Sequence, residues 1–266
     1  MFDYSGKKVL VVGGTSGINR GIAASFASAG ASVAVVSRSQ DKVDDTVTAL
    51  TKLGAQARGF AADVRDQPGF AKGLQALCTE WGELDVVISG AAGNFPALAN
   101  GMSANGFKSV IEIDLLGTFH VLQSCYPHLK KPGASIINVS APQAFLPMVG
   151  QSHVCAAKAG VDMITKTLAM EWGPEGIRVN SVVPGPIAGT EGMKRLAPTP
   201  EAEARTAATV PLRRLGLPED LGKACLFLCS DWASYISGAI LPVDGGFALA
   251  GASSLSLMLE KALRAG

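Results

Sequence analysis

The chain alternates short β-branched runs with longer segments of helical periodicity, and it does so as far as Val243. Several runs are apolar throughout, as expected of strands that helices cover on both faces. Such regular alternation predicts an α/β fold, one doubly wound domain with a parallel sheet and right-handed crossovers. The predicted strands cover residues 7–12, 31–37, 56–64, 84–89, 135–140, 177–183 and 238–243.

Two of the helical segments have clear patterns. Residues 17–30 carry Ile18, Ile22 and Phe26 at helical spacing, and residues 153–173 form a longer helix that ends at a glycine. No repeat or linker-like stretch divides the chain, so we predict a single domain over residues 1–266.

Two regions are less regular. Residues 185–215 are rich in proline, glycine and charge, and their length predicts a mobile substrate lid. Residues 251–266 place apolar side chains on one face of a helix. We expect this C-terminal helix to pack on its own domain or on a sister subunit rather than on a membrane.

Composition excludes several classes of function. The 266 residues are 48% hydrophobic, enough for a large core, and the net charge of +1 argues against a nucleic-acid partner. No segment resembles a signal peptide or a membrane span. The five cysteines lack a disulfide or zinc spacing, so we predict buried thiols, no metal and a cytoplasmic location.

A glycine-rich turn, "VVGGTSGINRG" at residues 11–21, joins the first strand to the first helix. Glycines let the backbone approach a pyrophosphate, and the helix N-terminus offers it free N–H groups. A purely structural turn is the alternative. The predicted cofactor-binding residues of this turn are Gly13, Thr15, Ser16, Gly17 and Ile18.

Arg38 follows the second strand, where a site for NAD normally presents an acidic residue to the ribose. A guanidinium flanked by Ser37 and Ser39 suits a 2′-phosphate, which favours NADP(H). The alternative is an ordinary surface arginine.

The glycine turn, "ADV" at 62–64, "AAG" at 91–93, the Lys158 helix, "VNSVVPGPI" at 179–187 and "GAILPVDGG" at 238–246 together resemble the short-chain dehydrogenase/reductase family. The resemblance covers essentially the whole chain and implies a seven-stranded Rossmann sheet in a homotetramer. It assigns Asp63 and Val64 to the adenine, Lys158 to the nicotinamide ribose and Pro184–Ile187 to the nicotinamide side. The cofactor positions carried over in this way are Asp63, Val64, Ala92, Gly93, Lys158, Pro184, Gly185, Pro186 and Ile187.

The chain departs from the family pattern at its catalytic positions. Val154 stands four residues before Lys158, where the family keeps a tyrosine, and Ala141 replaces the partner serine. Asp114 occupies the place of an asparagine, and Asn19 replaces a glycine of the phosphate turn, close to the expected phosphates.

These departures resemble one subgroup, the 2,4-dienoyl-CoA reductases, especially the peroxisomal type. The segments that carry this resemblance are "AAGNF" at 91–95, "IDLLGTF" at 113–119, "SHVCAAKAGVD" at 152–162 and "GPIAGTEGMKRL" at 185–196. The resemblance implies reduction of an acyl-CoA thioester with NADPH, as an accessory to fatty acid β-oxidation. The chain ends "LRAG", which is no peroxisomal address and favours a cytosolic relative.

A conjugated dienoyl thioester can be reduced without the tyrosine. Hydride enters the distal diene carbon, so the site must stabilise a dienolate and deliver a proton to carbon, for which water is one route. We predict Asp114 and Lys158 as the catalytic residues and Asn94, Phe95 and His153 as substrate-binding residues.

Structural roles stay open as alternatives: Asp114 as a helix bridge, Asn94 as a turn residue and His153 as a buried structural histidine. Two other functions also stay open. One is a tyrosine-less reductase of another enone or carbonyl, and the other is a non-catalytic NADP(H)-binding scaffold.

Overall fold

A seven-stranded, all-parallel sheet in the order β3-β2-β1-β4-β5-β6-β7 forms the centre of the computed structural model, which describes residues 2–249. The strands are β1 Lys8–Val12, β2 Ser32–Ser37, β3 Ala57–Ala61, β4 Val86–Ser89, β5 Ser135–Val139, β6 Arg178–Pro184 and β7 Ile240–Val243. All seven predicted strands are confirmed. The predicted strand at 56–64 is too long, because the chain leaves the sheet after Ala61.

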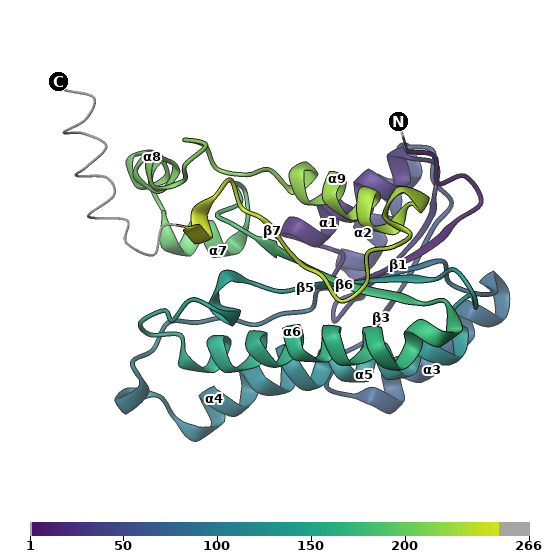
Figure 1. The fold of residues 1–266 in the computed structure, drawn as a ribbon, viewed down its shortest axis with the longest axis horizontal. Helices are drawn as coiled ribbons and strands as arrows, with labels where there is room; N and C mark the ends of the chain where they lie inside the picture. Colours follow the sequence, from purple (N-terminus) through teal and green to yellow (C-terminus); the bar gives the residue numbers. More distant parts are fainter. Residues whose placement is uncertain (1, 250–266) are drawn as a thin grey trace.

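Helices cover both faces of the sheet (Figure 1). α1 (Gly17–Ser28), α2 (Gln40–Lys52) and α9 (Pro218–Cys229) lie on one face. α3 (Gln67–Trp81), α5 (Gly117–Cys125) and α6 (Ser152–Trp172) lie on the other.

Shorter elements connect these layers. They are α4 (Ala104–Val110), a π-helical segment (Ile111–Leu116), α7 (Glu191–Leu196), α8 (Pro200–Thr209) and short 3₁₀ turns at Ala99–Gly101, Tyr126–His128, Pro142–Ala144, Gly173–Glu175, Asp231–Ala233 and Phe247–Leu249. The predicted lid at 185–215 therefore contains α7 and α8. The predicted helix at 251–266 lies outside the described residues.

Alternation along the strands builds two hydrophobic layers. Val9 and Val11 of β1 pack toward α1 and α9, whereas Leu10 and Val12 pack toward α3 and α5. All four side chains are essentially inaccessible to solvent. This double burial explains why the strands are apolar throughout rather than alternating.

The strand order reverses between β1 and β4, so the connections that leave these two neighbours run to opposite halves of the sheet. In an open parallel sheet, such a switch point leaves a crevice outside the carboxyl ends of the strands, where ligands bind. The glycine turn after β1 and the "AAGNF" segment after β4 both lie at this edge.

Candidate active site

A cavity of about 310 Å³ lies at the switch point. Its walls come from the turn after β1, the end of β2, the segment after β3 and the segment after β4. Its lining residues include Gly13, Thr15, Ser16, Asn19, Arg38, Lys42, Asp63, Val64, Ala92 and Gly93. The structure thus brings together eight of the fifteen predicted cofactor residues, whereas Gly17, Ile18, Lys158 and Pro184–Ile187 do not line this cavity.

Gly13 shapes the floor of this cavity. Its φ of +77° is unfavourable for other residues, and a Cβ there would lie 3.0 Å from the backbone nitrogen of Ala91. Beyond it, Ser16 is the N-cap of α1 and does not cap the helix with its own side chain, so the first N–H groups of α1 face the cavity edge. A turn of this shape fits a pyrophosphate.

Asn19 lies beside this floor. Its Nδ2 donates a hydrogen bond of 2.7 Å to the carbonyl oxygen of Gly90, and its side chain is buried at the cavity wall. The side chain that was expected near the phosphates therefore also ties α1 to the end of β4. No local sequence pattern indicates this contact.

Two cations line the end of the cavity next to β2. Arg38 was predicted there, and the structure adds Lys42 from the first turn of α2. The Ser39 side chain accepts the backbone N–H of Lys42 at 3.4 Å and caps α2. The helix cap therefore fixes Lys42 on the same side as Arg38, a pairing that the sequence reasoning missed.

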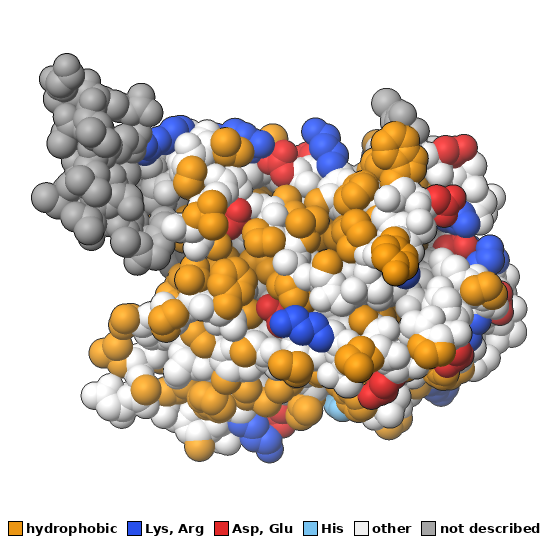
Figure 2. Space-filling model, in the orientation of Figure 1, with side chains coloured by type: hydrophobic (Ala, Val, Ile, Leu, Met, Phe, Trp, Pro, Cys, Tyr) orange, Lys and Arg blue, Asp and Glu red, His pale blue; other side chains and the backbone are white. Residues whose placement is uncertain are grey.

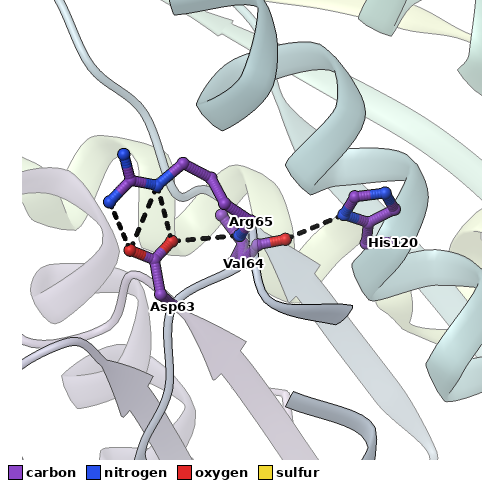
Figure 3. A network of polar contacts seen from close by, with 4 residues as sticks. All are labelled: Asp63, Val64, Arg65 and His120. Atoms are coloured by element: carbon purple, nitrogen blue, oxygen red, sulfur yellow. Dashed lines mark hydrogen bonds and ion pairs between the residues drawn. The ribbon is translucent and has the colours of Figure 1, made fainter. Parts of the chain in front are cut away.

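The predicted adenine residues, Asp63 and Val64, are each held by a neighbour (Figure 3). Arg65 donates to both carboxylate oxygens of Asp63, from Nε to Oδ1 at 3.0 Å and from Nη2 to Oδ2 at 2.5 Å. These hydrogen bonds keep the pKa of the Asp63 carboxyl below its ordinary value, so it stays ionised. His120 of α5 contacts the Val64 carbonyl oxygen through Nδ1 at 3.0 Å.

The two predicted catalytic residues meet in the interior. Asp114 Oδ2 lies 3.4 Å from Lys158 Nζ, and both residues are almost fully buried. Asp114 Oδ1 accepts the backbone N–H of Gly93 at 2.7 Å, while Lys158 donates to the Val139 carbonyl oxygen at 3.0 Å. One ion pair therefore links α6 to the ends of β4 and β5.

Local structure explains how Asp114 reaches this position. It lies in the π-helical segment Ile111–Leu116, where the wider turn changes which side chains face the sheet. Its backbone carbonyl oxygen accepts the Thr118 hydroxyl at 2.7 Å. π segments are often found at functional sites, in agreement with the catalytic prediction.

Apolar packing fills the position of the absent tyrosine. Val154 is buried against Val110 and Ala157, with Phe95 packed on the same cluster. Ala141 follows directly after Ser140, whose hydroxyl is buried at the end of β5. Neither Val154 nor Ala141 can donate a proton, so neither replaces the acid that the family pattern has here.

The predicted substrate residues lie next to this cluster. The rings of Phe95 and His153 have centroids 4.6 Å apart, and His153 is fully buried. Within residues 2–249, neither ring nitrogen of His153 has a hydrogen-bond partner. Asn94 is exposed at the start of this segment. Phe95 and His153 are therefore in contact, and Asn94 precedes Phe95 in the chain.

Pro184–Ile187 do not line the cavity at the switch point. Gly185, Pro186 and Ile187 line a separate hollow of about 540 Å³ beside Gly216 and the end of β7. The loop that follows β6 does reach the glycine turn, because a Cβ on Gly17 would lie 3.6 Å from Thr190 Cγ2. The predicted nicotinamide residues thus adjoin the cofactor cavity without forming its wall.

In the described part of the chain, no cluster of histidine, cysteine and carboxylate residues could hold a metal ion. None of its helices is both long enough and apolar enough to span a bilayer. Cys78, Cys125 and Cys225 are buried, and burial raises the pKa of the Cys78 thiol to about 11, so it stays protonated.

Comparison with known proteins places this geometry in a family. A family model described as enoyl-(acyl carrier protein) reductase matches residues 12–248. The chain belongs to the short-chain dehydrogenase/reductase family. It is an oxidoreductase whose Rossmann-like sheet and crevice are those expected of the family.

Individual relatives agree with this assignment. A peroxisomal 2,4-dienoyl-CoA reductase ((3E)-enoyl-CoA-producing) of Arabidopsis thaliana is 42% identical over 91% of this chain and 84% of its own. A probable 2,4-dienoyl-CoA reductase ((2E)-enoyl-CoA-producing) of Bacillus subtilis is 40% identical over 90% of this chain and 96% of its own.

Among solved structures, a putative NAD(P)-dependent gluconate 5-dehydrogenase of Beutenbergia cavernae with bound NADP superposes with a TM-score of 0.86. It is 29% identical and covers 92% of this chain and 98% of its own.

Proposed function

We propose that the protein reduces conjugated 2,4-dienoyl-CoA thioesters with NADPH. The observation that carries this proposal is the buried Asp114–Lys158 pair beside a tyrosine position filled by Val154. Relatives named 2,4-dienoyl-CoA reductases, at 42% and 40% identity, support the substrate class. The role would be that of an accessory enzyme of fatty acid β-oxidation.

The residues around the cavity fit a phosphorylated dinucleotide. Gly13, Thr15, Ser16, Gly17 and Ile18 would hold the pyrophosphate, Arg38 and Lys42 the 2′-phosphate, and Asp63 and Val64 the adenine. Ala92, Gly93 and Lys158 would bind the nicotinamide ribose, and Pro184–Ile187 the nicotinamide side. The bound dinucleotide would supply a hydride to the substrate.

This chain's own residues would handle the charge and the proton. Once the distal diene carbon is reduced, negative charge spreads to the thioester oxygen, and nearby donors stabilise it. Lys158 contributes positive potential, while Asp114, fixed by the Gly93 N–H, orients or protonates a water that delivers a proton to carbon. Asn94 and His153 are proposed donors to the thioester oxygen, and Phe95 would flank the acyl chain.

The proton can reach either of two carbons of the dienolate. Protonation of carbon 2, next to the thioester carbon, leaves a 3-enoyl product. Protonation of carbon 4 leaves a 2-enoyl product. The Arabidopsis and Bacillus relatives are named for these two different products. Product analysis after turnover will assign this chain to one of them.

Assembly and location stay predictions from the sequence. Hydrophobic side chains are numerous on the molecular face that contains α6 (Figure 2), and α6 exposes Met163 and Met170. Exposed apolar side chains of this kind suit a subunit interface, which supports the predicted homotetramer. A cytoplasmic location is likewise proposed, although several relatives are named as peroxisomal.

The experiment that tests the proposal is a substrate panel at fixed NADPH. We expect rapid NADPH oxidation with 2,4-dienoyl-CoA thioesters and little with 2-enoyl-CoA thioesters or simple ketones. Turnover of another enone or a ketone alone would favour the second function, a tyrosine-less reductase with a different substrate. Tight NADPH binding without turnover of any of these compounds would favour a non-catalytic scaffold.

A further inference from the structure

One turn of α5 holds Val64 at two points. His120 Nδ1 lies 3.0 Å from the Val64 carbonyl oxygen, and because a carbonyl oxygen only accepts, the ring nitrogen donates. Gly117, three residues earlier on the same helix face, lies so close that a Cβ there would be 2.6 Å from Val64 Cγ2. Both contacts reach Val64 from outside the cavity that it lines.

Asp63 is restrained at the same time by Arg65 (Figure 3). The cavity wall next to β3 therefore consists of two consecutive residues whose positions are fixed by neighbours. Neither β3, which ends at Ala61, nor α3, which begins at Gln67, includes these residues. Two backbone hydrogen bonds, from Ala62 N–H to Ser37 and from Asp66 N–H to Asp63, shape this connection, and the contacts from α5 and Arg65 add side-chain restraints to its two wall residues.

We infer that His120 is a positioning residue for the adenine half of the dinucleotide. The inference rests on the proposed binding of NADP(H). A wall that is ordered before binding costs no ordering entropy when the ligand arrives, so the His120 contact contributes to affinity without touching the ligand. The contribution is confined to ligands that carry an adenine.

The hydrogen bond also fixes the state of the ring. Nδ1 must carry a proton, so in the neutral ring Nε2 has none. The chain has three histidines, so ¹⁵N spectra of the imidazole nitrogens can be assigned by substituting each in turn. The wild-type signals that disappear in His120→Asn belong to His120. We expect their chemical shifts to show a protonated Nδ1.

Adenosine 2′-monophosphate is the direct probe, because it carries the adenine and the phosphate but no nicotinamide. By calorimetry, His120→Leu should weaken its binding and that of NADPH by roughly three- to tenfold, the value of one hydrogen bond. His120→Asn keeps a donor near the Nδ1 position and should stay within about twofold of the wild type. His128→Leu changes another partly exposed histidine, which does not line the cavity, and should have no effect.

Reduced nicotinamide mononucleotide separates positioning from a general structural role. It lacks the adenine, so its KM should be the same in the wild type and His120→Leu, as should kcat at saturating NADPH. Gly117→Ala favours the helix, but the added Cβ pushes Val64 away. This variant should weaken the binding of adenosine 2′-monophosphate without altering any histidine.

Two outcomes would overturn the inference. One is wild-type affinity of His120→Leu for adenosine 2′-monophosphate. The other is an equal loss toward the mononucleotide, which would indicate damage to the fold. A wild-type protein that binds neither NADPH nor adenosine 2′-monophosphate would instead remove the proposed cofactor itself, and the inference with it.

Discussion

Lys158 and Asp114 form an ion pair of 3.4 Å in which 5% and 1% of the two residues' surfaces are exposed. Desolvation makes such a pair costly unless further hydrogen bonds complete it. Here the Val139 carbonyl oxygen and the Gly93 N–H do so. The pair therefore connects three segments at the carboxyl edge of the sheet, next to the position where the family keeps its tyrosine.

Asp114→Asn keeps an acceptor for the Gly93 N–H but removes the negative charge and the acid. We expect kcat for a dienoyl-CoA to fall by about 10²- to 10⁴-fold, the usual contribution of a general acid or base. The Kd for NADPH should change little. Steady-state kinetics and calorimetry measure the two quantities.

Glu112→Gln is the matched control, since Glu112 lies in the same π segment but pairs with Lys108 at the surface. It should leave kcat unchanged. An equal fall in both variants would show that the segment, rather than the Asp114 carboxylate, is responsible.

Val154→Tyr restores the family's side chain without restoring its environment. Val154 is buried against Val110 and Ala157, so the larger ring should lower the free energy of unfolding by about 1–3 kcal/mol. We expect no gain in ketone reduction. Chemical denaturation and a ketone assay test both points, and a stable variant that reduces ketones faster than the wild type would contradict the account.

Arg38→Gln should discriminate between the two nicotinamide cofactors. Loss of a charge-assisted hydrogen bond to the 2′-phosphate should raise the KM for NADPH by about tenfold or more and leave that for NADH unchanged. Arg58→Gln, an exposed arginine of β3 outside the cavity, is the control. If NADH were as good a substrate as NADPH in the wild type, the assignment of Arg38 would be wrong.

The buried carboxyl of Asp162 should make the free energy of unfolding depend on pH. Burial raises the pKa of its carboxyl above the ordinary value, although Ser181 Oγ lies 3.5 Å from Oδ1. Folding thus favours the protonated acid, and this stabilisation is lost as the pH rises through the folded-state pKa.

Asp162→Asn carries no charge at any pH. Its free energy of unfolding should therefore exceed that of the wild type near neutral pH, and the difference should shrink toward about pH 4. Urea denaturation at several pH values measures this. A difference that grows as the pH falls would contradict the assignment.

The sequence was sufficient for the fold because strand and helix periods are local patterns, and a regular alternation permits few sheet topologies. The place of Lys158 and Asp114 in one site was also predicted, since each stands at a recognisable position of the family pattern. Lys42, the Asn19–Gly90 contact and the His120–Val64 contact were missed. The two contacts join segments 71 and 56 residues apart, and such pairings leave no periodic signal.

For Pro184–Ile187, the sequence predicted the position in the fold but not the cavity that the residues line. Their motif placed them correctly at the carboxyl edge of β6, but backbone pairing of Ile187 with Gly216 and of β6 with β7 places them at a separate hollow. A motif gives a position along the chain, whereas the wall to which it belongs depends on packing across the whole edge of the sheet.

In the proposed reaction, hydride enters the distal carbon of a conjugated thioester. Turnover of a 2,4-dienoyl-CoA with NADPH deuterated at the transferred position shows which carbon receives it, with the product examined by NMR and mass spectrometry. We expect one deuterium at carbon 5 of an enoyl-CoA product and a solvent-derived proton at carbon 2 or carbon 4. Deuterium at any other carbon, or no turnover with any dienoyl-CoA, would contradict it.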